Sequence, residues 1–133
     1  MSRKPSCRPV APAFVLADLP GLIEGAHAGI GLGHEFLRHV ERTRALAHLV
    51  EPFPADGSDP VENYRTVRAE LTRYRADLAQ KPEVIAMTKA ELPGSVDVLA
   101  RMQRDLDVIA ISAVTGAGLE KFVQRLVQAL AIV

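Results

Sequence analysis

The sequence predicts an α/β protein with a mostly parallel sheet of about four strands flanked by helices. Short apolar runs alternate along the chain with amphipathic patterns of helical period. Strands that are buried on both faces of a parallel sheet read as continuous apolar runs of this kind. Helical crossovers between such strands are right-handed. The four predicted strands lie at residues 14–17, 46–50, 83–87 and 108–111.

Four helices are predicted, at residues 32–45, 60–80, 96–104 and 119–130. The second has the clearest pattern, because apolar residues recur every three or four positions. These residues are Val61, Tyr64, Val67, Leu71, Tyr74 and Leu78. Asp59 suits the N-cap, Pro60 the first helical position and Glu62 a capping box. Pro82 is expected to end this helix.

Composition limits the function classes. A chain of 133 residues suits one domain. An apolar content of 48% and a formal net charge of zero indicate a globular protein without the bulk charge that binds DNA or membrane surfaces. The one cysteine, Cys7, excludes an internal disulfide and fits a reducing compartment. No apolar run approaches the ~20 residues of a membrane span. We therefore expect a cytoplasmic protein with no membrane span and no DNA partner.

The first 13 residues differ from the rest, because they are basic, rich in proline and free of acid. We interpret residues 1–13 as a disordered or non-homologous tail, with a short targeting leader as the alternative. Residues 14–133 are then expected to form the domain.

Three loops follow predicted strands. Ligands of open α/β sheets bind at the carboxyl ends of the strands. These loops are therefore expected to meet at one edge and to form a binding site. They are Asp18-Leu19-Pro20-Gly21, Thr88-Lys89-Ala90-Glu91 and Ser112-Ala113-Val114.

The stretch around the first loop resembles a known family. Residues 18–21 match the third GTPase motif, DxxG, and residues 21–27 and 31–44 closely resemble the switch II segment of the Obg family of GTPases. The resemblance extends over about residues 14–130. It implies a partial P-loop NTPase (GTPase) fold, with residues 14–133 a partial Obg-type G domain. It also implies GTP and GDP as ligands, Mg²⁺ as cofactor, and GTP hydrolysis linked to assembly of the ribosomal large subunit.

The resemblance assigns roles to the second and third loops. Thr88-Lys89-Ala90-Glu91 stands where the family has NKxD, so Glu91 keeps the charge of the guanine-reading Asp on a side chain one methylene longer. Thr88 lacks the carboxamide of Asn. Lys89 is retained, and its stem is expected along the purine face. Ser112-Ala113-Val114 resembles the fifth motif, in which a backbone N–H reaches the guanine oxygen.

In the first loop, the resemblance implies that Asp18 holds Mg²⁺ through a water and that Gly21 offers its N–H to the γ-phosphate. Leu22 stands where many GTPases carry a water-orienting glutamine, so hydrolysis is expected to be slow and no catalytic residue is assigned.

The sequence has no G-x-x-x-x-G-K-[ST] phosphate loop, because none of its four lysines follows a glycine. That loop is the principal cradle for pyrophosphate. We therefore expect weak or no nucleotide binding, and GTPase activity of this chain is in doubt.

A second function also remains open. The chain could be a catalytically dead interaction module whose switch-like surface docks a ribosome or a protein partner. A zinc site of the H-E-x-x-H type is excluded, because Arg38 stands four residues after His34. Arg38, Arg42 and Arg44 suit either a contact with ribosomal RNA or a solvated helix face.

The placement of the first strand is also open. In the GTPase fold that this chain resembles, a further strand lies between the strands at 14–17 and 46–50. Residues 14–17 either close up beside 46–50, which pairs backbone groups that otherwise lack partners, or stay detached from a three-stranded remainder.

Overall fold

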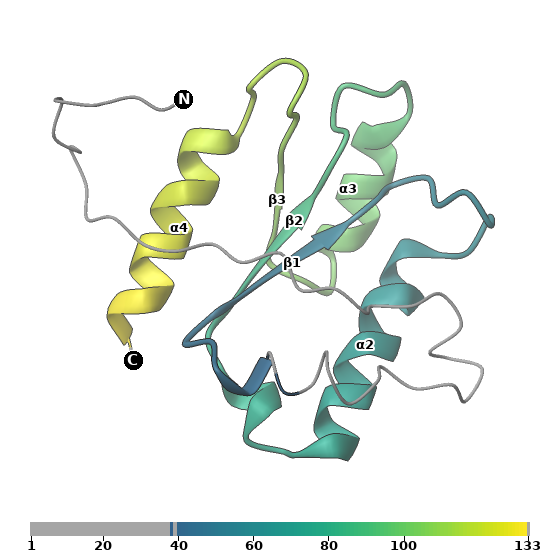
Figure 1. Ribbon diagram of the computed structural model, residues 1–133. Helices are drawn as coiled ribbons and strands as arrows, with labels where there is room; N and C mark the ends of the chain where they lie inside the picture. The colour runs from purple at the N-terminus through teal and green to yellow at the C-terminus, as the bar shows by residue number, and fades with distance from the viewer. Residues whose placement is uncertain (1–37, 39, 133) are drawn as a thin grey trace, which may run out of the picture.

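The computed structural model describes residue 38 and residues 40–132 (Figure 1). These residues form a parallel sheet in the order β1-β2-β3, with strands β1 (Leu46–Val50), β2 (Glu83–Met87) and β3 (Val108–Ala110). The expected α/β class with a parallel sheet is confirmed. The predicted strand at 14–17, the tail at 1–13 and the start of the first predicted helix lie outside the described residues. The helices and one 3-10 turn are α2 (Pro60–Tyr74), η2 (Leu78–Gln80), α3 (Ser95–Gln103) and α4 (Leu119–Ile132).

The helices cover the two faces of the sheet. Figure 1 shows α4 on one side of the strands and α2 and α3 on the other. On the α4 side, Ala86 and Ile109 pack against Phe122 and Leu126. On the opposite side, a second buried cluster joins the sheet to both helices; its members include Val50, Ile85 and Met87 of the sheet, Val61 and Tyr64 of α2, and Met102 of α3. Burial on both faces explains why residues 84–87 of β2 and all of β3 are apolar.

Helix α2 begins as predicted and ends earlier. The Asp59 carboxylate accepts a hydrogen bond from the N–H of Glu62 at 3.0 Å, and Pro60 is the first helical residue. The helix was expected to reach residue 80, but it ends at Tyr74, because Arg75 takes an extended conformation with φ −157° and ψ 126°. Leu78 nevertheless packs in the core with Leu71. The apolar period in the sequence therefore continues past the end of the helix and gives no sign of it.

The first predicted helix also ends early. It was expected to reach residue 45, whereas the described part ends at Glu41. The N–H and the Oγ1 of Thr43 both bond to the carbonyl of Val40, at 3.1 and 2.8 Å, which closes the last turn. Ala45 then packs with the cluster on the α4 face.

Two further bounds differ slightly from those expected. Helix α3 begins at Ser95 and ends at Gln103, where 96–104 was predicted. Strand β3 ends at Ala110, although the N–H of Ile111 still bonds to the carbonyl of Met87 at 2.9 Å.

A cluster of polar side chains joins β1, β2 and α2 on the α2 side of the sheet. The Tyr64 hydroxyl donates to Oε1 of Glu83 at 2.7 Å, and Nδ1 of His48 lies 3.2 Å from Oε2 of the same carboxylate. Nη1 of Arg68 lies 3.7 Å from Oε1 of Glu83. Burial alone raises the pKa of Glu83, but the hydrogen bonds from His48 and Tyr64 and the charge of Arg68 outweigh it, so the pKa lies below its ordinary value of 4.5.

Candidate functional site

The carboxyl edge of the sheet brings the second and third predicted loops together. The N–H of Thr88 bonds to the carbonyl of Val50 at 2.9 Å, and the N–H of Ala90 bonds to the carbonyl of Ile111 at 3.0 Å. The loop at 88–91 is thus joined to the ends of both neighbouring strands. The first predicted loop, Asp18 to Gly21, lies outside the described residues.

Glu91 is held by the third loop. The Ser112 hydroxyl donates to Oε1 of Glu91 at 2.7 Å and accepts from the N–H of Thr115 at 3.1 Å. Ser112 is only 1% exposed, so its position is set by packing. The hydrogen bond from Ser112 is the main reason that the pKa of Glu91 lies below its ordinary value. Glu91 is therefore an ionised hydrogen-bond acceptor. Ser112 bonds only to its Oε1, which leaves Oε2 without a bond from Ser112.

Replacing Ser112 with Ala is expected to raise the pKa of Glu91 toward its ordinary value, because the hydrogen bond that favours the carboxylate is lost. The folded state should also lose about 1–2 kcal/mol, since the N–H of Thr115 loses its acceptor. Carbon-detected NMR titration of the Glu91 carboxyl measures the first effect, and urea unfolding measures the second.

Ser58→Ala is the matched control, because the Ser58 hydroxyl also bonds to an exposed carboxylate, but to Oδ1 of Asp56 and not to Glu91. It should leave the titration of Glu91 unchanged. An unchanged pKa of Glu91 in Ser112→Ala would show that this hydroxyl does not hold the carboxylate.

Lys89 has an unusual backbone. Its φ is +57°, the one positive value at a non-glycine among the described residues. Its Nζ lies 3.2 Å from Oε1 of Glu51, the residue that follows β1. Thr88 directs its Oγ1 to the carbonyl of Val50 at 3.4 Å, so its hydroxyl serves the strand end and not the neighbouring loop.

The third loop is folded on itself. The N–H of Ser112 bonds to the carbonyl of Ala117 at 3.0 Å, and the N–H of Gly116 bonds back to the carbonyl of Ser112 at 2.8 Å. Within the described part of the chain, the N–H groups of Ala113 and Val114 have no such acceptor. Val114 is 79% exposed. The tip of this loop therefore presents backbone donors to solvent beside Glu91.

Two residues of this edge escaped the sequence reasoning. Glu51 reaches Lys89, as described above, and Ser95 donates from its hydroxyl to the carbonyl of Ala90 at 2.7 Å while only 2% exposed. Glu51 could have been found, because it directly follows a predicted strand and so had to lie at the same edge. Ser95 had been placed just before its helix.

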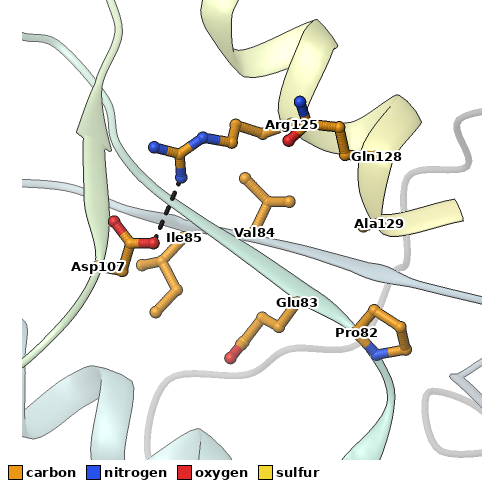
Figure 2. Close-up of a pocket in the computed structure, with 8 residues that line it drawn as sticks. All are labelled: Pro82, Glu83, Val84, Ile85, Asp107, Arg125, Gln128 and Ala129. Carbon is orange, nitrogen blue, oxygen red and sulfur yellow. Dashed lines mark hydrogen bonds and ion pairs between the residues drawn. The ribbon is translucent and has the colours of Figure 1, made fainter. Parts of the chain in front are cut away.

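A cavity of about 360 Å³ lies at the other end of the sheet (Figure 2). Its lining residues are Pro82, Glu83, Val84, Ile85, Asp107, Arg125, Gln128 and Ala129. Beside it, Arg125 reaches from α4 to Asp107, with 3.3 Å between Nη1 and Oδ2. Because Glu83 and Asp107 stand at the amino ends of β2 and β3, this cavity is separate from the loops at the carboxyl edge.

Among residues 38 and 40–132, no three or more His, Cys, Asp or Glu gather as a metal ion would require. Asp18, the predicted contact of Mg²⁺, lies outside the described residues. Over the same residues, no helix has the length and apolar character needed to cross a membrane.

Parallel strands with crossover helices, and loops gathered at the carboxyl edge, define part of the α/β fold of P-loop NTPases of the GTPase type. Residues 2–89 match the family model described as 50S ribosome-binding GTPase. The chain belongs to this family and carries part of an Obg-type G domain.

Curated relatives agree with this assignment. The chain is 50% identical to a protein named GTPase Obg from Heliobacterium modesticaldum over 84% of its own length and 26% of that protein. It is 48% identical to GTPase Obg from Alkaliphilus oremlandii, over 82% of this chain and 26% of the relative. For GTPase Obg from Roseiflexus castenholzii, the identity is 45% over 89% and 28%. The chain thus spans about a quarter of the length of these relatives.

Proposed function

We propose that the chain binds GTP or GDP at the carboxyl edge of the sheet, with Glu91 and the third loop reading the guanine base. The observation that carries this proposal is the Ser112–Glu91 hydrogen bond, which holds an ionised carboxylate beside the N–H groups of Ala113 and Val114. Neither N–H has an acceptor among the residues that the structure describes. Guanine presents N–H donors next to a carbonyl acceptor on one edge. An acceptor beside backbone donors is complementary to that edge.

The second loop completes the proposed base site. Lys89 offers an aliphatic stem that suits the face of a purine. Thr88 and Ala90 contribute through their backbone, because their N–H groups fix the loop to the strand ends. We extend the proposal to the first loop, Asp18, Leu19, Pro20 and Gly21, on family resemblance alone.

In that loop, Asp18 would meet Mg²⁺ through a water, and Gly21 would meet the γ-phosphate. One carboxylate cannot hold a hard cation that takes six oxygens, so Mg²⁺ is expected to add little to binding. With no G-x-x-x-x-G-K-[ST] phosphate loop in the sequence, most of the affinity must come from the base. We therefore propose weak nucleotide binding and assign no catalytic residue.

The cellular role is proposed from the family. The name of the matching family model refers to binding of the 50S ribosome, and GTP hydrolysis linked to ribosome assembly in the cytoplasm is the corresponding proposal for the whole protein. A catalytically dead module that docks a ribosome or a protein partner is the second candidate. It is favoured by the 79% exposure of Val114 at the same edge.

Nucleotide titrations of the ¹⁵N-labelled chain test the proposal. GDP and GMP should shift the amide resonances of Lys89, Glu91 and Ala113, whereas ADP should not. GMP should bind almost as well as GDP, because the base supplies most of the contacts. A chain in which no nucleotide moves these three amides would favour the docking module and overturn the proposed function.

A double variant tests base recognition directly. Thr88→Asn combined with Glu91→Asp is expected to increase the preference for GDP over ADP about tenfold, since a well-placed bidentate pair is worth ~1–3 kcal/mol. Asp107→Asn, at the opposite end of the sheet, is the control and should change nothing. Equal affinities of the double variant and the parent for both nucleotides would show that residues 88–91 do not read guanine.

A further inference from the structure

The backbone of Lys89 is held on both sides in a conformation that a lysine rarely adopts. A φ of +57° brings the Cβ of any L-residue other than glycine close to its own backbone. The N–H before it, at Thr88, is bonded to Val50, and the N–H after it, at Ala90, is bonded to Ile111. Such a conformation persists where neighbouring structure enforces it, and it is most common at ligand sites. The direction in which the Lys89 side chain leaves the loop is therefore fixed.

The tip of that side chain is held as well. Oε1 of Glu51 lies 3.2 Å from Nζ of Lys89, and both side chains are 53% exposed. The register pairs Val50 with Met87, so the residues that follow these strands lie side by side at one edge. The ion pair thus spans the ends of β1 and β2, and the aliphatic stem of Lys89 is restrained at both ends.

We infer that Glu51 is a positioning residue, which holds the stem of Lys89 as a preformed apolar surface for the purine. This inference rests on the proposed function. A lysine side chain has several rotatable bonds, and a ligand that needs it in one conformation must otherwise restrict them on binding. The pair also neutralises the Glu51 carboxylate, so that the edge gains no net negative charge against an anionic nucleotide.

The ion pair between Glu51 and Lys89 is not expected to contribute much to the stability of the fold. Ion pairs between half-exposed side chains contribute little to folding, because solvent screens them and ordering two long side chains costs entropy. A change at Glu51 should therefore leave the unfolding midpoint nearly unchanged. The effect is expected in the order of the Lys89 side chain and in ligand affinity.

Glu51→Gln in the full chain tests the inference with two readouts. Without ligand, NMR relaxation of the Lys89 Cε methylene should show greater mobility in the variant. With ligand, the affinity for GMP should fall about threefold. Glu51→Asp should restore most of the GMP affinity. Glu62→Gln is the matched control, because it removes an exposed carboxylate that pairs with Arg65 of the same helix and not with Lys89.

Each contrary outcome is distinct. Unchanged Lys89 mobility, or a GMP affinity that stays the same or rises in Glu51→Gln, would overturn the positioning role while GMP binding by the parent upholds the proposed function. If Lys89 becomes mobile in the variant but GMP binds neither protein, the proposed function fails and the positioning role fails with it.

Discussion

Gly118→Ala is expected to destabilise the protein by about 2–5 kcal/mol. A Cβ at this position would lie 2.0 Å from the carbonyl oxygen of Ala110, and a backbone oxygen of β3 cannot move aside. Overpacking of this kind costs roughly 1–3 kcal/mol. The φ of +75° at Gly118 adds ~1–2 kcal/mol for a residue with a side chain. Urea unfolding at constant pH measures the sum.

Gly116→Ala separates the two contributions. Gly116 has nearly the same φ, +83°, but a Cβ there would meet nothing within 4 Å. This variant should lose only the ~1–2 kcal/mol of the backbone conformation. If both variants lose the same free energy, the close approach of Gly118 to β3 does not constrain the loop. The loop at 112–118 should also be disturbed only in Gly118→Ala, which the amide resonances of Ala113 and Val114 report.

The strands were the part of the fold best predicted from sequence. The bounds of β1 and β2, 46–50 and 83–87, were predicted to the residue, because both strands are mostly apolar segments bounded by proline or polar loops. The start of α2 followed from Asp59 and Pro60, whose capping chemistry is local. The end of α2 could not be predicted in this way, since Leu78 continues the apolar pattern from a separate 3-10 turn.

The candidate site was predicted only as far as strand ends determine it. The juxtaposition of 88–91 with 112–114 follows from parallel strands that end at one edge, and the hydrogen bond from Ala90 to Ile111 realises it. The partners of individual side chains depend on contacts between distant segments, which neither period nor spacing encodes. The pairing of Glu51 with Lys89 is one such contact. The roles of all the predicted site residues, Asp18 included, stay predictions.

Replacing Glu83 with Ala is expected to cost about 2–4 kcal/mol. The Glu83 side chain is only 12% exposed and is the shared partner of His48, Tyr64 and Arg68. Removing it leaves the Tyr64 hydroxyl without its acceptor and the Arg68 guanidinium without its counter-charge, and buried polar groups keep most of their desolvation cost. Among the described residues, Nη1 of Arg68 has no hydrogen-bond partner, so the Glu83 carboxylate stabilises it by charge alone. Asp107→Ala is the control, because its pairing with Arg125 leaves Asp107 85% exposed and is worth at most ~1 kcal/mol.

Glu83→Gln tests the charge of the cluster separately from its size. The pKa of Glu83 is lower in the folded chain than its ordinary value of 4.5, so the carboxylate stabilises the fold above that value and loses its contribution as the pH falls through the folded pKa. The difference in unfolding free energy between the parent and Glu83→Gln should therefore be largest near neutral pH and should shrink steadily in acid. Urea unfolding of both proteins from about pH 7 to about pH 3 measures it. A difference that stays constant over this range would mean that Glu83 acts through shape and neutral hydrogen bonds, and that its charge does not hold β1, β2 and α2 together.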